Sequence, residues 1–254
     1  MSSTAAPARV LPAAWALPGE TIERAFLLAG LAYAVCVSPF IGGIRGVPVA
    51  MGWLAIPLLW AWRAKAWREL GLAPGRPAAV WLRQVILSAA AGAVVAVAVL
   101  GVAEVYPELL RFLGVIPALH RDTVNGNIPL FLALIPVAHA VHELFYRGFL
   151  QSRLSARLGS PAAAILLAGL LYAWTHVFIY SSLEYSAGLS ALFGPGSGDD
   201  VAATLRAVAL FALLESVGAG MAFHKTQNLF TAVAFRAAHL ITLCAVVFPR
   251  IGLL

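Results

Sequence analysis

Residues 83–103 read RQVILSAAAGAVVAVAVLGVA, and this stretch decides the fold class. After Arg83, no charged side chain interrupts the stretch until Glu104. About 20 residues of α-helix, rising 1.5 Å each, cross the hydrocarbon core of a bilayer. The apolar residues run continuously rather than alternating, which argues against a strand of a membrane β-barrel. The stretch therefore predicts a transmembrane helix.

The composition of the whole chain supports the same class. Of its 254 residues, 61% are hydrophobic and only 11% are charged, whereas an ordinary soluble domain carries about 25% charge. So few charges cannot cover a globular surface, which excludes a soluble enzyme. Six further apolar runs have comparable lengths: 22–42, 47–62, 128–150, 161–181, 203–223 and 228–248. We therefore expect an all-α, polytopic helical membrane protein with about seven transmembrane helices.

The runs divide the chain into three parts. Residues 1–20 form an Ala/Pro-rich N-terminal tail, residues 21–127 hold three N-terminal transmembrane helices, and residues 128–254 hold a four-helix core. Cys36 and Cys244 both lie inside apolar runs, so no disulfide framework is expected. The Gly/Pro-rich loop after the fifth run is either a plain connector or a gate over a cavity.

The basic residues predict the orientation. They gather in the loop after the second run and after the fourth and sixth runs: Arg63, Lys65, Arg68, Arg76, Arg83, Arg147, Arg153, Arg157 and Lys225. By the positive-inside rule these ends are cytoplasmic, so the N-terminus is cytoplasmic and the C-terminus lies outside. The net charge of +6 thus reflects membrane topology, and no nucleic-acid partner is expected. The high content of Ala and Arg in the sequence favours a bacterial protein of the inner membrane.

The fourth run carries the densest set of ionisable residues. His139, Glu143 and Arg147 are spaced i, i+4, i+8 and share one helical face, with His142 and Tyr146 beside it. Ionisable groups inside a membrane helix are costly and mark functional sites. The alternative interpretation is structural, with Glu143 and Arg147 neutralising each other.

The other core runs bring further ionisable residues. Tyr172 and His176 are i, i+4 partners on the fifth run, and the seventh run carries Arg236 and His239 one turn apart. Three helices thus each bring a histidine to the bilayer interior. This convergence favours general acid–base chemistry on water, or a metal site.

Glu215 on the sixth run and Arg236 on the seventh are expected to form an ion pair. The two runs are antiparallel through a turn near Thr226, and at 1.5 Å per residue both side chains lie about 15–16 Å from it. The competing hypothesis is that Glu215 points into the polar site.

The core resembles a known family. His142-Glu143-Leu-Phe-Tyr-Arg147 resembles the Glu-Glu-x-x-x-Arg motif of the type II CAAX prenyl protease and bacteriocin-processing family, and Tyr172-Ala-Trp-Thr-His176 resembles its Phe-x-x-x-His motif. The stretch 218–230, followed by a helix with His239, resembles the family's last motif region. The resemblance covers roughly 128–245. It implies a membrane-embedded protease, of glutamic type or metal-assisted, that cleaves a membrane-anchored or lipidated protein or peptide.

Two motif positions depart from the family pattern. His142 replaces the first Glu, the residue that the family favours as water activator. In the His-x-x-x-Asn motif, Leu243 stands four residues after His239, and counting from Leu229 the family's His position falls on Arg236. These departures keep a second function open, a non-catalytic membrane scaffold, chaperone or immunity-type binding protein. A proton-coupled transporter is less favoured because the sequence shows no internal repeat.

Two mechanisms stay open if the chain is an enzyme. In the first, Glu143 or His142 deprotonates a water together with His176, His239 stabilises the oxyanion and Arg147 holds the acidic face in register. The resemblance then predicts Glu143 and His176 within direct or one-water reach. In the second, a divalent metal such as zinc supplies the nucleophilic water. Its candidate ligands are His139, His142, Glu143, His176 and His239, although no HExxH motif is present.

Overall fold

A computed structural model describes residues 16–36, 46–72, 77–105, 128–181 and 198–250. Within these ranges every regular element is a helix and none is a strand, which confirms the all-α prediction. Most of the predicted tail and of the loop 182–202 lies outside the described residues.

Each of the seven predicted runs overlaps a helix, and residues 37–42 of the first run lie outside the described residues. In chain order the helices are α1 (Ala16–Cys36), α2 (Gly46–Ala64), α3 (Ala78–Val105), α5 (Ile128–Glu143) with its continuations η5 (Leu144–Gln151) and α6 (Ser152–Leu158), α7 (Pro161–Ser181), α9 (Gly198–Thr226) and α10 (Leu229–Arg250). Four of the described helices, α3, α7, α9 and α10, contain spans long and apolar enough to cross a membrane.

Helix α1 begins at Ala16, earlier than the expected start at residue 22, so the end of the predicted tail is helical. Pro18 falls in the first turn, where a missing N–H costs nothing. One turn later Arg24 pairs with Glu20 at 2.8 Å across i, i+4. This pairing explains how a helix begins before its apolar run.

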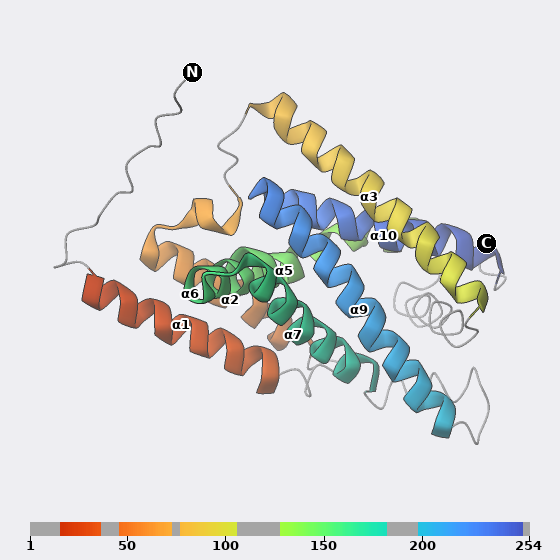
Figure 1. Cartoon of the computed structure of the whole chain (residues 1–254), viewed down its shortest axis with the longest axis horizontal. Helices are drawn as coiled ribbons and strands as arrows, with labels where there is room; N and C mark the ends of the chain where they lie inside the picture. Colours follow the sequence, from red (N-terminus) through yellow and green to blue (C-terminus); the bar gives the residue numbers. More distant parts are fainter. Residues whose placement is uncertain (1–15, 37–45, 73–76, 106–127, 182–197, 251–254) are drawn as a thin grey trace.

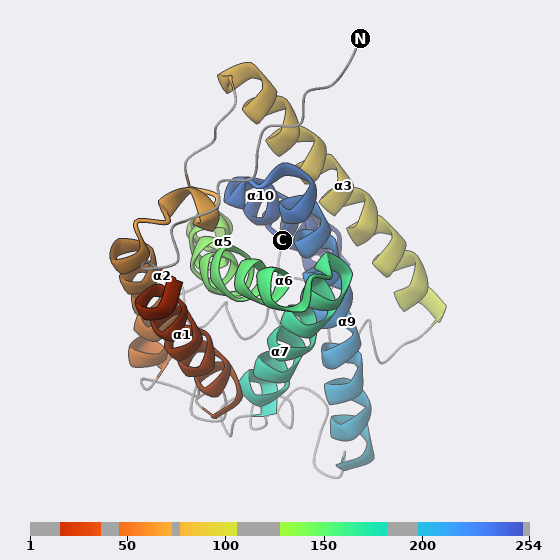
Figure 2. The same ribbon diagram turned by 60° about the vertical axis from the view of Figure 1, so that its left-hand side comes forward.

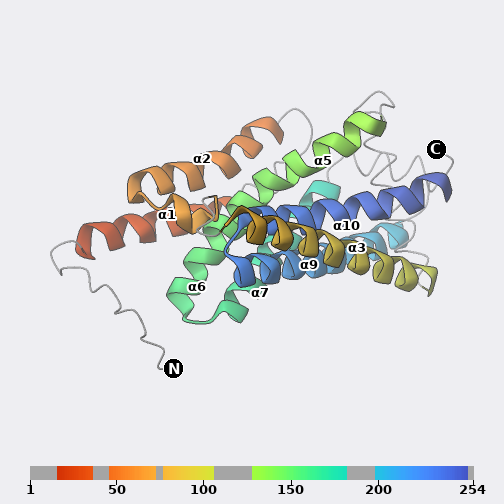
Figure 3. The same cartoon turned by 90° about the horizontal axis from the view of Figure 1, so that it is seen from above.

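Helix α10 lies at the centre of the arrangement. It packs along α3 over a long contact and also touches α5 and α9, while α7 packs along α9. Figure 1 shows α3 crossing over α10, and Figure 2 shows α3 on the opposite side of α10 from α1 and α2. Seen from above, α3, α9 and α10 extend together past the region where α5, α6 and α7 meet (Figure 3).

The fourth predicted run continues without a break from α5 through η5 to Leu158. It ends at Gly159, whose φ of 64° is the left-handed conformation of a helix C-cap, and whose N–H donates to the Ser155 carbonyl at 3.0 Å. The Ser160 hydroxyl then accepts the Ala163 N–H at 3.3 Å, and Pro161 opens α7. This tight reversal brings α7 back toward the middle of the preceding helix.

Gly92 is the point where α3 and α10 come closest. A Cβ added at Gly92 would lie 2.0 Å from the Phe235 carbonyl oxygen, which is backbone and cannot turn aside. Gly101 is on the same helix, and a Cβ there would meet nothing within 4 Å. The α3–α10 contact therefore requires glycine at residue 92.

We expect Gly92→Ala to lower the thermal unfolding temperature of the purified protein in detergent, because α3 must move off α10. Overpacking of this kind costs about 1–3 kcal/mol. The matched change Gly101→Ala should stabilise by up to about 1 kcal/mol, since alanine is the better helix former. Equal effects of the two changes would contradict the close approach.

Candidate functional site

Glu143 and Arg147 form a fully buried ion pair on the fourth predicted run. The Arg147 Nε donates to Glu143 Oε2 at 3.2 Å, and neither side chain has exposed surface. Arg147 also donates to the Ser216 hydroxyl on α9 and, at 3.5 Å, to Gln151 Oε1 one turn further on. The expected pairing across i, i+4 is therefore confirmed, and it ties α5 and η5 to α9.

The helix around Arg147 is a π-helix. All eight residues of η5 are buried, and π-helical turns inside α-helices often mark functional sites. Gly148 sits within this segment, and a Cβ there would lie 2.9 Å from the carbonyl oxygen of Leu70 in the short 3-10 helix η4 (Trp67–Leu70). Because Gly148 has no side chain, η4 packs directly against the backbone of the π-helix η5.

Arg236 of α10 joins the carboxylates of two other helices. Its Nη1 donates to Glu143 Oε1 at 2.8 Å, and its Nη2 donates to Glu215 Oε2 at 3.2 Å. Nη2 also donates to the Tyr172 hydroxyl, and the guanidinium lies 4.3 Å from the centre of that ring. The predicted Glu215–Arg236 ion pair is confirmed, and it is part of a larger cluster of charged side chains rather than an isolated pair.

The cluster balances its charges. Glu143 and Glu215 face Arg147 and Arg236, and none of the four side chains is more than 6% exposed. A charge left alone at this depth costs at least about 2.5–3.5 kcal/mol on insertion scales. Removing one partner of such a buried pair is therefore more damaging than the net worth of the pair.

Tyr172 connects Arg236 to His176. The His176 Nδ1 lies 2.9 Å from the Tyr172 carbonyl oxygen, which can only accept, so Nδ1 carries the proton. Nε2 of the neutral ring is then the acceptor for the Tyr172 hydroxyl at 2.6 Å. The sequence predicted Glu143 and His176 within direct or one-water reach, but the structure connects them through the Arg236 guanidinium and the Tyr172 hydroxyl instead.

His142 lies beside His176, and one nitrogen of the His142 ring has no hydrogen-bond partner among the described residues. The two rings lie 5.9 Å apart, and the Trp53 ring holds His142 edge-on at 4.4 Å. The buried Nδ1 of His142 has no hydrogen-bond partner among the residues that the structure describes. This histidine stands at the position of the motif's first Glu, and its free ring nitrogen can accept a proton.

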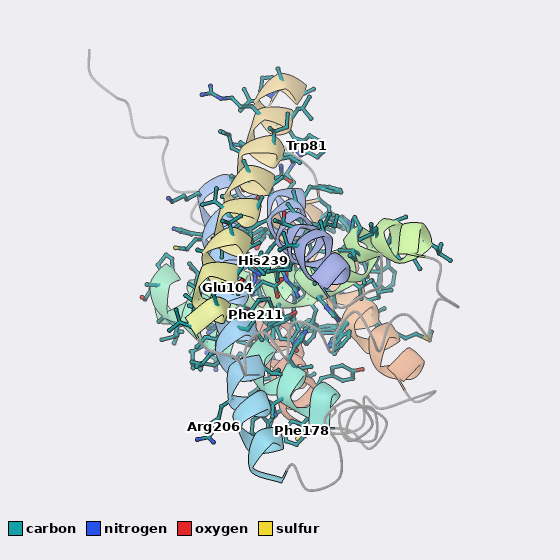
Figure 4. All side chains as sticks on the ribbon, turned by 90° about the vertical axis from the view of Figure 1, so that its right-hand side faces the viewer. Trp81, Glu104, Phe178, Arg206, Phe211 and His239 are labelled. Carbon is teal, nitrogen blue, oxygen red and sulfur yellow. The ribbon has the colours of Figure 1, made fainter. Side chains whose placement is uncertain are left out.

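His239 lies elsewhere than expected. Its ring packs 5.1 Å from the Phe211 ring and 6.4 Å from the Phe235 ring, and it interacts with the Gly92 backbone. Figure 4 shows His239 and Phe211 in the interior beside α3, whereas Arg206 points away from the bundle. The expectation that His239 faces the polar site is therefore corrected: Arg236, one turn earlier, reaches the Glu143 carboxylate.

The candidate metal ligands do not form a donor set. Within the described ranges, no three His, Cys, Asp or Glu side chains are placed to share a metal ion. Both oxygens of Glu143 bond to arginines, and both ring nitrogens of His176 bond to Tyr172. His139 keeps two nitrogens without a partner among the described residues, but no group of three donor side chains forms around it there. The residues therefore do not fit zinc.

Sequence reasoning missed several polar neighbours of the cluster. Ser216 and Gln151 carry no charge, so their presence in apolar runs gave no strong signal. Tyr146 and Thr175 share a buried hydrogen bond of 2.7 Å between the η5 and α7 segments. The i, i+4 spacing of Gln151 from Arg147 is the signal that identifies the glutamine.

We expect Tyr172→Phe to destabilise the protein more than Tyr146→Phe. The first change strips a bond from Arg236 and another from His176, and each lost partner costs about 1–3 kcal/mol. The second change leaves Thr175 its bond to the Leu171 carbonyl. Thermal unfolding of the two variants in detergent compares them, and equal losses would show that the Tyr172 hydroxyl adds nothing beyond its ring.

Comparison with known proteins gives one match. The family model described as type II CAAX prenyl endopeptidase Rce1-like matches residues 124–242. This range holds the two stretches that resemble the family's first two motifs, together with Arg236, and it covers a little under half of the chain. The resemblance drawn from the motifs is confirmed. No curated protein and no solved structure gives a significant match.

Proposed function

We propose that the chain hydrolyses a peptide bond in a membrane-anchored or lipidated protein, because residues 124–242 match the model of the Rce1-like family of CAAX prenyl endopeptidases. The observation that carries the proposal is the meeting of His142, Glu143 and His176 from two helices beside the Arg236 guanidinium. The core from residue 128 onward holds the chemistry, and the three preceding helices support it. The chain lies in a bacterial inner membrane with its N-terminus in the cytoplasm.

His142 is the general base of the proposed reaction. Of the three candidate bases it alone has a buried nitrogen without a partner in the described structure. His142 removes a proton from water as the water oxygen bonds to the scissile carbonyl carbon. The same proton then passes to the leaving amine when the C–N bond breaks. His176, held in one tautomer by Tyr172, keeps its ring edge against His142.

Arg236 takes the oxyanion role that the motif pattern assigned to a histidine. A guanidinium has five N–H donors. The contacts to Glu143, Glu215 and Tyr172 use Nη1 and Nη2, while the buried Nε has no partner among the described residues. A fixed cationic donor stabilises the negative oxygen of a tetrahedral intermediate without reorganising.

One observation favours the non-catalytic alternative. Both oxygens of Glu143 are held by arginines, so this carboxylate is neutralised in place and acts as a structural partner. In a scaffold, chaperone or immunity-type protein the same cluster would hold α5, α9 and α10 together. Binding of a membrane partner without cleavage would then be the function.

The test uses a fluorogenic prenylated peptide ending in a CAAX sequence, with the purified protein in liposomes. We expect His142→Phe to reduce cleavage by about 10²–10⁴-fold, the usual contribution of a general base. His142→Glu, which restores the motif residue, should retain cleavage. Chelators should have no effect, because the donor set does not fit a metal.

Trp53→Phe is the matched control, because it changes the ring that contacts His142 but removes no titratable group. It should retain most of the cleavage. Binding of the peptide without cleavage by the wild type would favour the scaffold, and full activity of His142→Phe would refute the proposed base.

A further inference from the structure

A cavity of about 280 Å³ opens at the end of α6, against the start of α7 and the end of α9. The polar side chains that line it are Gln151, Ser152, Arg153, Ser155, His224 and Gln227, together with Glu69. Its residues lie in the region that the positive-inside rule predicts to be cytoplasmic. The cavity shares no residue with the ionic cluster of Glu143, Arg147, Glu215 and Arg236.

A stripe of polar side chains joins the cavity to that cluster. Glu143, Arg147, Gln151 and Ser155 follow one another at steps of four along one continuous helix. The stripe extends over residues 143–155 of this helix, and eight of these residues form the π-helical segment. Glu143 belongs to the buried cluster, while Gln151 and Ser155 line the cavity. The stripe thus leads from the protein's surface to the proposed catalytic residues.

Gln151 lies between the cavity and the ionic cluster. It is only 3% exposed, its Oε1 accepts from Arg147 at 3.5 Å, and its Nε2 donates to the Gly220 carbonyl at 3.0 Å. A Cβ at Gly220 would lie 2.8 Å from that Oε1, so the glycine leaves room for the amide in its present position. The 3.5 Å contact is at the long limit for a hydrogen bond, which leaves the Arg147 side of the amide loosely held.

We propose that this stripe is the water access path to the buried site and that Gln151 is its gate. Water passing through apolar helix packing would lose its hydrogen bonds, whereas a water beside Gln151, Arg147 and Ser216 finds two to four polar partners. The inference goes beyond the proposed function, since a water path exists or not whatever reaction the cluster performs. Its test therefore does not depend on cleavage.

The test measures how fast a small hydrophilic thiol reagent, 2-hydroxyethyl methanethiosulfonate, labels a cysteine at the inner end of the path. The background carries Cys36→Ser and Cys244→Ala, which remove the two free thiols. In it, Ser216→Cys places a thiol beside Arg147, and mass spectrometry follows its modification in detergent. Gln151→Leu should slow the labelling by about tenfold, which is about 1.4 kcal/mol in the barrier. Gln151→Ala should speed it.

Ala219→Cys is the matched control. Ala219 lies one turn closer to the cavity end of α9 but is fully buried in the apolar core. If the polar stripe is the path, the Ser216→Cys thiol reacts faster than the Ala219→Cys thiol despite its greater depth. Three results would each overturn the proposal. They are faster labelling at Ala219→Cys, no labelling at Ser216→Cys in any variant, and labelling rates that neither Gln151 substitution changes.

Discussion

The bond between Arg236 and Glu143 is the interaction on which the rest of the site depends. It joins α10 to α5 across the centre of the molecule, with 2.8 Å between Nη1 and Oε1 and both side chains almost completely buried. Each further polar contact starts from one of these two residues: Arg147 and then Ser216 from the carboxylate, Glu215 and Tyr172 from the guanidinium. Because a lone charge is costly in a membrane, these partners hold four helices in one register.

The helices themselves could be predicted from the sequence. Hydrophobic length alone placed seven runs, and the run 161–181 coincides with α7 at both ends. The start of α1 could not be placed, because a helix that begins in polar sequence shows no apolar pattern. The π-helical segment η5, where η4 packs against Gly148, could not be predicted either, because the apolar run through it looks like any other helical run.

The site was predictable in its members but not in all its contacts. The equal distances of Glu215 and Arg236 from the turn between their helices predicted that pair. The i, i+4 spacing predicted the pair of Glu143 and Arg147. Periodicity cannot say which face of α10 meets which neighbour, so it gave the inward role to His239, whose ring packs near Phe211 of α9 and Phe235 of α10 instead. In the structure α10 lies against Gly92 of α3 at Phe235, and the neighbouring Arg236 faces the carboxylates. Metal ligation failed for a related reason: the arginines already occupy Glu143.

A double-mutant cycle on thermal unfolding tests this account most directly, using Glu143→Gln, Arg236→Gln and the combined variant in the same detergent. Breaking a buried pair from one side costs about 3–5 kcal/mol because the other charge is left alone. The account predicts that the combined variant loses clearly less than the sum of the two single losses, with a coupling of at least about 1.5 kcal/mol. Losses that add to within about 0.5 kcal/mol would contradict it, because additivity marks residues that do not interact.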